Sequence, residues 1–316
     1  MPATHAQNFI LLEEKLREVN SEAETRKDLD PMIDKLFKVM TTEDAFVQFL
    51  GYSDLPDLVP FDGLFTELEQ YPGYKSRVVF PEFGGKTVRE KKLVDDNGFE
   101  QVFADASAFV RSSNRTKEKY AGRFWGNLTS ATWDFMQNDE NVALASNSHT
   151  TPVPDISTAT GFDNLGTDAF SYTALHQAMY NMRQFRNSIG EQINRPEKVY
   201  AVLHPDWLTW QVEQVIGTEK GLDADEGNVN PAHKDLLGNK RFVSIPYSRL
   251  DGYSTTSWGL LDLEGIMRNF VFFNRIQGEY ETHVDRETKN IIQTYYNRFG
   301  LGNKPDGWRD IYWNNA

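Results

Sequence analysis

The side chains that could hold a metal ion or transfer a proton are scattered along this chain. Its six histidines occur singly, without the HxH, HxxxH or HExxH spacing that brings two imidazoles to one metal ion: His5, His149, His176, His204, His233 and His283. His149 with Asp155 forms at most half of a metal site, because their loop offers no third ligand at a usable spacing. His204 and Asp206 flank a proline between a predicted strand and a predicted helix, where a capping role accounts for both. We expect structural or surface histidines, with no metal and no cofactor.

The motifs of the common enzyme classes are missing as well. The chain has no cysteine, which removes thiol nucleophiles and thiolate metal sites, and it contains no GxSxG, Walker P-loop or GxGxxG. Residues 223–228 (DADEGN) resemble a calcium loop, but the glycine comes one position early and the twelfth position is Lys234 in place of a glutamate. Glycosidase carboxylate pairs are set by spatial distance, and nothing in the sequence selects one. The sequence therefore predicts a protein that is not an enzyme.

Charge and hydropathy narrow the possibilities further. Asp and Glu number 46 against 33 Lys and Arg in 316 residues, a net charge of -13, which disfavours tight binding of a phosphate backbone by the surface as a whole. No apolar run is long enough to cross a bilayer, and residues 1–19 lack the basic, apolar and small-residue order of a signal peptide. We expect a soluble protein that is not exported and has no membrane partner.

The element that dominates the sequence is a long predicted helix at residues 97–137. Asn97 and Glu100 have the spacing of a capping box, and an unbroken helix of this length would measure roughly 60 Å at about 1.5 Å per residue. Gly122 and Gly126 are the positions where it could bend or split. Its apolar stripe recurs in steps of three and four: Phe99, Val102, Phe103, Ala106, Phe109, Val110, Ser113, Lys117, Tyr120, Phe124, Leu128, Ala131 and Phe135.

A charged two-stranded ribbon is predicted before this helix. Residues 64–69 and 74–80 alternate in polarity around a Pro72-Gly73 turn, Gly84-Gly85 ends the ribbon, and residues 87–94 form a further charged strand. Such a ribbon buries too little apolar surface to be stable alone, so we expect it to project and to pack on another molecule. Residues 1–53, with short amphipathic pieces around Leu12 and Leu36, are expected to form an arm with little core of its own.

The charges of the ribbon allow two interpretations. Basic residues cluster on it and on the strand that follows, which could indicate nucleic-acid binding or a salt-bridged protein interface: Lys75, Arg77, Lys86, Arg89, Lys91 and Lys92. The interleaved acidic residues favour the interface: Glu67, Glu69, Glu82 and Glu90. The predicted subunit interface contains Leu64, Glu67, Lys75, Arg77, Glu82, Lys86 and Arg89.

The remainder is predicted to be an α+β unit of mixed order. Helices are expected at 167–189 and from Pro205 to Gly217, and a buried strand at 199–203. Further strands are expected at 242–247, 258–263 and 269–275, followed by a hairpin of 280–284 with 290–299 and a closing strand at 308–313.

This order of parts resembles the major capsid protein of tailed bacteriophages. FDGLFTELEQYPGYKSRVVFPEFGGKTVREKKLVDDNG and NVALASNSHTTP are similar to the ribbon-to-helix passage and the following loop of Mu-type major head subunits. The resemblance implies an N-terminal arm (1–53), an E-loop ribbon (54–88), a peripheral domain (89–166) with spine helix 97–137, an axial domain (167–275), a return hairpin (276–300) and a C-terminal strand (301–316).

The resemblance also implies a function. Such subunits assemble as hexamers and pentamers into a closed head around double-stranded DNA, with scaffolding, portal and decoration proteins as further partners, and they end in the virion after assembly in the host bacterial cytoplasm. An acidic lumen would let the packaged duplex slide. Two alternatives stay open: an encapsulin-type compartment that holds cargo enzymes, and a soluble enzyme with an extended oligomerisation arm.

Overall fold

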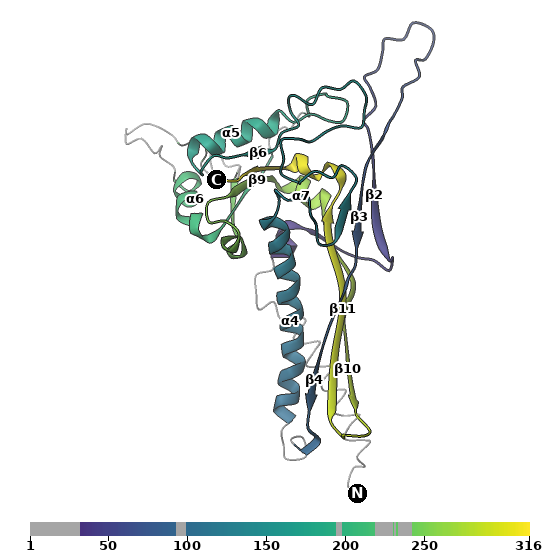
Figure 1. Ribbon diagram of the computed structural model, residues 1–316. Coiled ribbons are helices and arrows are strands. Elements are labelled where there is room, and N and C mark those ends of the chain that lie inside the picture. The colour runs from purple at the N-terminus through teal and green to yellow at the C-terminus, as the bar shows by residue number, and fades with distance from the viewer. Residues whose placement is uncertain (1–31, 93–98, 194–197, 219–229, 231, 233–241) are drawn as a thin grey trace.

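The computed structural model describes residues 32–92, 99–193, 198–218, 230, 232 and 242–316. Figure 1 shows a body of helices and strands from which a long helix and a long hairpin descend side by side, while a ribbon leaves the body on the other side and ends in a projecting loop. Among these described residues, no helix combines the length and apolar character needed to cross a membrane. The amphipathic piece around Leu12 and the calcium-like residues 223–228 lie outside them.

The descending part is one helix on one sheet. The helix α4 (Phe99–Gly126) lies beside a four-stranded sheet with the order β1-β10-β11-β4, whose strands are β1 (Lys38–Thr41), β10 (Phe270–Val284), β11 (Ile291–Asn303) and β4 (Glu82–Arg89). The predicted last hairpin is confirmed and is longer than expected, because β10 and β11 pair antiparallel from Phe270 opposite Asn303 to Val284 opposite Ile291.

Side chains hold α4 against this sheet along most of its described length. Phe109 stacks on Tyr295 with ring centroids 5.9 Å apart, and the Asn297 side-chain amide donates to the Ser113 hydroxyl at 2.6 Å. Phe299 is fully buried and stacks on Phe83 at 4.5 Å. Aromatic contacts of this kind contribute beyond their buried area, so helix and sheet form one packed layer pair.

The predicted helix 97–137 is too long. It ends at Gly126, where a Cβ would collide with the Tyr253 ring, and β5 (Met136–Asn138) follows a turn. Leu128 and Phe135 are buried although they lie outside the helix, since the returning chain re-enters the same core. The apolar periodicity of the sequence therefore continues past the end of the helix, because it follows buried positions and not helical ones. The 28 residues span about 42 Å at 1.5 Å each, and the proposed cap Asn97 lies outside the described residues.

The ribbon differs from its prediction. Its strands are β2 (Phe46–Tyr52) and β3 (Pro72–Val79), which pair antiparallel, and β5 pairs with the other edge of β3. Residues 64–69 belong to the loop between the two strands, and Gly84-Gly85 lies within β4. The prediction failed because alternating polarity at 64–69 does not correspond to one buried face: Leu64 is 81% exposed. Pro72 starts β3, a place where a strand tolerates a missing amide donor.

The first described residues belong to the core, contrary to the expected arm. In α2 (Met32–Leu36) all three apolar side chains are buried, and Phe37 packs on Phe124 and Trp125 at 5.5 and 5.9 Å. The buried Glu118 of α4 accepts a hydrogen bond from the Ile33 amide at 3.3 Å. Residues 32–37 are therefore fixed to α4, and the prediction of little core is wrong for this part.

The body is built on a five-stranded sheet with the order β6-β12-β9-β7-β8. Its strands are β6 (Leu165–Gly166), β12 (Ile311–Asn314), β9 (Trp258–Asp262), β7 (Tyr200–His204) and β8 (Phe242–Pro246). The helices around it are α5 (Tyr172–Arg183), α6 (Thr209–Ile216) and α7 (Leu263–Asn269), with short 3-10 turns η1 (Asp206–Leu208), η3 (Ser248–Gly252) and η4 (Pro305–Asp310).

Several predictions for the body are confirmed, and three are confirmed with different bounds. The strands near 199–203, 242–247 and 258–263 and the helical stretch from Pro205 to Gly217 are present. Helix 167–189 is shortened to α5, because Ser171 caps it. The predicted strand 269–275 is the start of the much longer β10, and residues 308–310 form part of η4 before β12.

Candidate functional site

The most exposed apolar segment of the described chain is the loop between β2 and β3, residues 53–71, here called the ribbon loop. Six of its apolar side chains are between 54% and 94% exposed: Leu55, Leu58, Val59, Phe61, Leu64 and Phe65. Phe61 and Phe65 contact each other with ring centroids 5.0 Å apart. Exposed apolar patches of this density are typical of protein interaction sites.

The base of the ribbon loop is fixed by hydrogen bonds, so the loop is presented from a defined position. Ser53 and Tyr71 face each other, since the Ser53 amide donates to the Tyr71 carbonyl at 2.9 Å and the Tyr71 amide donates to the Ser53 hydroxyl at 2.8 Å. The Asp54 amide donates to the Ser188 hydroxyl at 2.8 Å, which ties the loop to the body. The ends of the loop are held while its tip projects, as Figure 1 shows.

The ribbon loop also carries charge of one sign. It contains five exposed carboxylates and no Lys, Arg or His: Asp54, Asp57, Asp62, Glu67 and Glu69. Glu69 accepts a hydrogen bond from the Tyr71 hydroxyl at 2.9 Å, which raises the pKa of that phenol above its ordinary value. The loop therefore combines exposed apolar and acidic side chains, a character that a basic and partly apolar surface would complement.

The structure divides the predicted interface residues into two groups. Leu64 and Glu67 lie in the ribbon loop, and Lys75 and Arg77 are exposed on β3, where the Arg77 guanidinium lies 3.8 Å from the Phe46 ring centroid. The second group lies on β4, at an edge of the long sheet: Glu82, Lys86 and Arg89.

The β4 residues differ in what they contact. Glu82 lies 3.9 Å from Arg298, and Lys86 is exposed. Arg89 donates two hydrogen bonds to Asp105 of α4 at 2.7 and 2.8 Å. Such a two-pronged ion pair is a strong contact within the chain, so Arg89 fastens α4 to β4.

A basic face of α4 went unnoticed in the sequence. Arg111, Arg115, Lys119 and Arg123 follow one another at intervals of four, and all four side chains are exposed. The i, i+4 spacing of these basic residues is visible in the sequence, but the sequence prediction used only the apolar stripe of the same segment. The sequence prediction also did not identify two exposed tryptophans, Trp207 of η1 and Trp210 of α6, because it considered only the buried side of this helical stretch.

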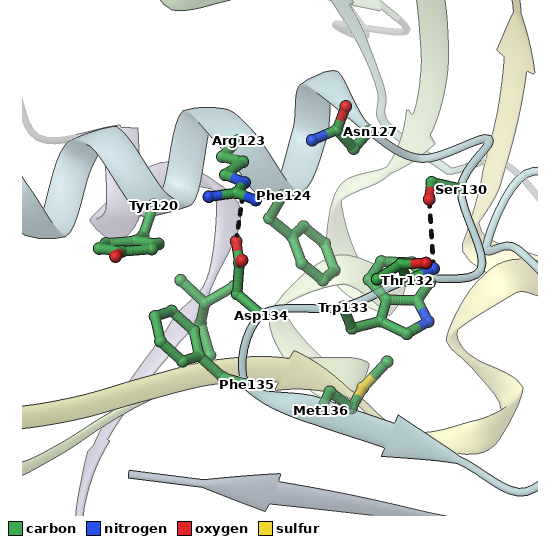
Figure 2. Close-up of a pocket in the computed structure, with 11 residues that line it drawn as sticks. Tyr120, Arg123, Phe124, Asn127, Ser130, Thr132, Trp133, Asp134, Phe135 and Met136 are labelled. Carbon is green, nitrogen blue, oxygen red and sulfur yellow. Dashed lines mark hydrogen bonds and ion pairs between the residues drawn. The ribbon is translucent and has the colours of Figure 1, made fainter. Parts of the chain in front are cut away.

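At the C-terminal end of α4, Arg123 stands beside a pocket of about 170 Å³. Figure 2 shows Arg123 pointing to Asp134, with which it forms an ion pair at 3.1 Å, and the aromatic rings of Tyr120, Phe124 and Trp133 around them. Pockets for small-molecule substrates usually measure about 300 to 1,000 Å³. This pocket is smaller than that range, and the polar side chains of Asn127, Ser130 and Thr132 line it together with the aromatic rings.

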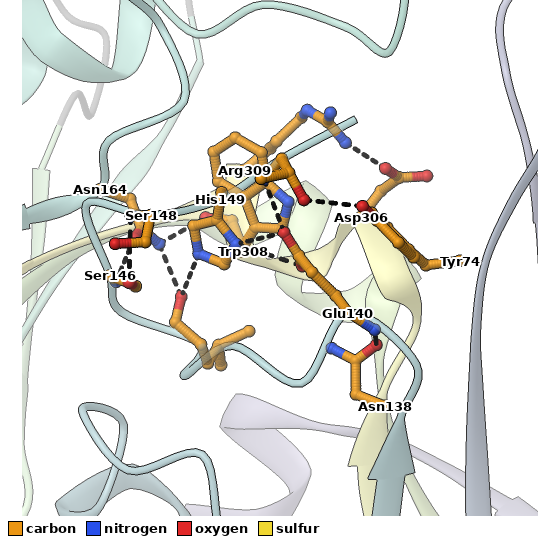
Figure 3. Close-up of polar contacts among 12 residues, drawn as sticks. Tyr74, Asn138, Glu140, Ser146, Ser148, His149, Asn164, Asp306, Trp308 and Arg309 are labelled. Carbon is orange, nitrogen blue, oxygen red and sulfur yellow. Dashed lines mark hydrogen bonds and ion pairs between the residues drawn. The ribbon is translucent and has the colours of Figure 1, made fainter. Parts of the chain in front are cut away.

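His149 is a buried structural histidine. Figure 3 shows its ring beside Trp308 and Glu140, and the ring centroids of His149 and Trp308 are 4.2 Å apart. The other ring nitrogen of His149 contacts the Leu144 carbonyl at 3.3 Å. Both ring nitrogens are therefore engaged, and the Glu140 carboxylate also accepts the Thr150 amide at 2.9 Å. This agrees with the expectation of a structural histidine, since His149 is used internally and Asp155 is exposed.

His204 is also structural, but it does not cap a helix. Its ring nitrogens contact the Pro205 carbonyl and the Ser244 hydroxyl, both at 2.9 Å, and burial lowers its pKa. Asp251 of η3 instead accepts the amides of Asp206 and Trp207 at 3.3 Å. The capping prediction failed because the cap is supplied from a distant segment. Within the described residues no three His, Asp or Glu side chains are grouped as metal ligands.

Comparison with known proteins places the fold. No family model matches the chain, and no curated protein does. The capsid of an empty GTA particle is similar with a TM-score of 0.55 and 11% identity, covering 92% of this chain and 91% of that one. The capsid of Myoviridae phage XM1 is similar with a TM-score of 0.52 and 12% sequence identity, and the match covers 92% of this chain and 93% of that one. The procapsid of bacteriophage JBD30 is similar with a TM-score of 0.51 and 9% sequence identity, and the match covers 100% of this chain and 76% of that one. The chain has the α+β fold of phage capsid proteins, which confirms the expected fold.

Proposed function

We propose that this chain is the non-catalytic subunit that assembles with copies of itself into the icosahedral head of a tailed bacteriophage, around double-stranded DNA. The fold shared with phage capsid proteins supports this. The observation that carries the proposal is the ribbon loop, in which six apolar side chains stay more than half exposed within the described chain.

The energetics of the ribbon loop favour association. Burying one large apolar side chain stabilises a contact by about 1.5 to 3 kcal/mol, so six of them provide a substantial driving force before the entropy cost of ordering. A loop on one side of the molecule that binds a different surface of the next copy makes a head-to-tail contact, and such contacts form closed rings when the rotation between copies closes. Rings of five and six copies are the units that the proposed shell needs.

We propose that the exposed members of the predicted interface take part in these contacts: Leu64, Glu67, Lys75, Arg77, Glu82 and Lys86. Arg89, which is paired with Asp105, would support the interface by holding β4 in place. The division into N-terminal arm, E-loop, peripheral domain and axial domain belongs to the same proposal. So do location in the virion, assembly in the host cytoplasm, and scaffolding, portal and decoration partners.

The test is the state of the purified full-length chain. Light scattering and negative-stain microscopy should show closed shells or their five- and six-membered rings, formed above a threshold concentration. A monomer or a small fixed oligomer at high concentration would contradict the proposal and favour the soluble enzyme with an oligomerisation arm. Shells that carry a specific cargo protein, and no genome-length DNA when isolated from their source, would favour the encapsulin-type compartment.

A further inference from the structure

The buried His149 has a hydrogen-bond acceptor at each of its two ring nitrogens. Its Nδ1 lies 3.1 Å from the Glu140 carboxylate (Figure 3), and its Nε2 lies 3.3 Å from the Leu144 carbonyl oxygen. A neutral imidazole has one N–H and donates to only one of two such acceptors, whereas an imidazolium donates to both. The side chains of His149 and Glu140 are each 2% exposed, so bulk water does not supply a missing donor. The geometry therefore favours the charged ring.

The surroundings of the ring also favour a positive charge. The rings of His149 and Trp308 are nearly parallel, at 7°, and the face of an indole attracts a cation that lies on it. Burial raises the pKa of the Asp163 carboxyl above its ordinary value, and the nearby positive charge of His149 opposes this shift. The guanidinium of Arg309, 4.5 Å from the Trp308 ring centroid, is paired with Asp306, which offsets its charge. Together these groups stabilise an imidazolium.

The other buried histidine of the described chain, His204, has a different pair of partners. It contacts the Pro205 carbonyl and the Ser244 hydroxyl, both at 2.9 Å. A hydroxyl donates as well as accepts, so a neutral ring satisfies both contacts. Burial lowers the pKa of His204, in agreement with a neutral ring. His204 is therefore an internal reference for the charge of His149.

His149 and Glu140 lie where the ribbon joins the body. Glu140 comes two residues after β5, the strand that pairs with β3, and its carboxylate accepts the Thr150 amide at 2.9 Å. The Thr150 hydroxyl lies 2.6 Å from the Tyr74 hydroxyl of β3. The contact between His149 and Glu140 therefore holds the chain after β5 against η4 of the body, and with it the root of the ribbon.

We propose that His149 is an imidazolium paired with the Glu140 carboxylate, and that this buried ion pair is a pH-sensitive latch between the ribbon and the body. When the ring gives a proton to the solvent as the pH rises, one of its two acceptors faces a nitrogen lone pair. Two acceptors in contact repel each other, so the latch opens and the ribbon gains freedom. Every contact that carries this inference lies within one chain, so it does not rest on the proposed function.

The charge of His149 can be measured by nitrogen NMR of the full-length chain labelled in histidine. An imidazolium gives two similar ring-nitrogen signals and a neutral imidazole gives two well-separated ones, while H149Q and H204Q assign the signals by their loss. At neutral pH His149 should be charged and His204 neutral. E140Q replaces the carboxylate by an amide that can donate to Nδ1, so His149 should become neutral while circular dichroism stays unchanged. A neutral His149 in wild type, or a charge that E140Q leaves in place, overturns the inference.

The latch itself can be measured by the distance between two spin labels in the unassembled chain. Q48C and Q214C place the labels on exposed positions of β2 and α6, and the chain has no cysteine of its own. Between about pH 6 and pH 9, across the range in which histidines titrate, the distance distribution should widen about twofold as the imidazolium signals of His149 disappear. In the E140Q background a neutral ring is already satisfied, so the width should stay constant.

Three results would contradict the latch. A constant width while the imidazolium signals disappear would show that the ion pair does not hold the ribbon. An imidazolium that persists to about pH 9 would be a fixed structural charge without a switch. Equal widening in E140Q would assign the pH dependence to other groups. None of these measurements uses assembly, so their failure is distinguishable from failure of the proposed function.

Discussion

The descending helix and sheet and the ribbon loop are both rich in aromatic residues, but they use them oppositely. Phe299 of β11 is fully buried among Phe83, Phe135 and Phe272, whereas Phe65 of the ribbon loop is 94% exposed. The first region completes its packing within one chain. The second has a fixed base and an unpacked tip, which indicates that its packing is completed by another molecule. Under the proposed function, the same residue type serves folding in one region and association in the other.

The largest expected effect is on the free energy of unfolding when the same Phe→Ala change is made at a buried position and at an exposed one. Phe299→Ala should lower the free energy of unfolding by about 3 to 5 kcal/mol, because it removes a buried ring and leaves a cavity. Phe65→Ala makes the same chemical change at an exposed position and should alter it by less than about 0.5 kcal/mol. Denaturant unfolding of the unassembled chains measures both. Equal losses would show that the ribbon loop packs on its own body.

For assembly, we expect the ribbon loop to matter more than it does for the stability of the fold. The double variant F61A/F65A should raise the threshold concentration by about tenfold or more, because it removes two large apolar contacts worth about 1.5 to 3 kcal/mol each. Light scattering against concentration measures the threshold, with Y180A as a control for loss of an exposed aromatic ring elsewhere. Assembly of F61A/F65A at the wild-type threshold would mean that the loop is not part of the contact.

A smaller effect is expected where α4 ends. Gly126→Ala should destabilise the fold by about 1 to 3 kcal/mol, because the added methyl group collides with the Tyr253 ring. Combining it with Tyr253→Ala should recover much of this loss, since the ring is then absent. Thermal unfolding of the single and double variants checks the pair. An unchanged or higher melting temperature for Gly126→Ala alone would show that the helix end tolerates a side chain.

The smallest effect concerns pH and the contact between α2 and α4. Burial raises the pKa of Glu118 above its ordinary value, although hydrogen bonds from the Ile33 amide and the Tyr247 hydroxyl oppose this. A raised carboxyl pKa means that the folded state holds the proton more tightly than the unfolded state, so its contribution to stability is present at low pH and is lost as the pH rises through the folded pKa. Glu118→Gln should remove this dependence.

The measurement is the free energy of unfolding of wild type and Glu118→Gln at a series of pH values. The variant should gain stability relative to wild type as the pH rises above the ordinary range of a glutamate. A difference that is constant over the series, or that moves in the other direction, would show that the hydrogen bonds outweigh burial at this carboxylate.

The sequence contained most of the fold but not the ends of its elements. The spacing from Ala106 to Phe124 identified α4, and the alternation in 290–299 identified part of β11. Leu128 and Phe135 extended the helix wrongly, because an apolar period persists wherever the chain returns to one core. Leu64 and Leu68 were predicted to form one face of a strand, because an exposed apolar side chain of a loop looks the same in sequence as a buried one.

The candidate site was only half visible in the sequence. The exposed ribbon was expected from its charge, and Leu64 and Glu67 do lie in the projecting loop. Exposure of Phe61 and Phe65 could not be derived, because burial depends on which distant segments cover them. The basic residues Arg111, Arg115 and Lys119 of α4 could be identified from the sequence, but only the structure shows that their side chains are exposed.

The most direct test of the account is amide hydrogen exchange, resolved by peptide, in the unassembled chain and in assembled particles. Protection of residues 53–71 should rise at least tenfold on assembly, while the pairing of β10 with β11, already complete in one chain, should keep nearly the same protection in both states. If the ribbon loop exchanges equally fast in both states, its apolar side chains are not buried by neighbouring copies, and the account is contradicted.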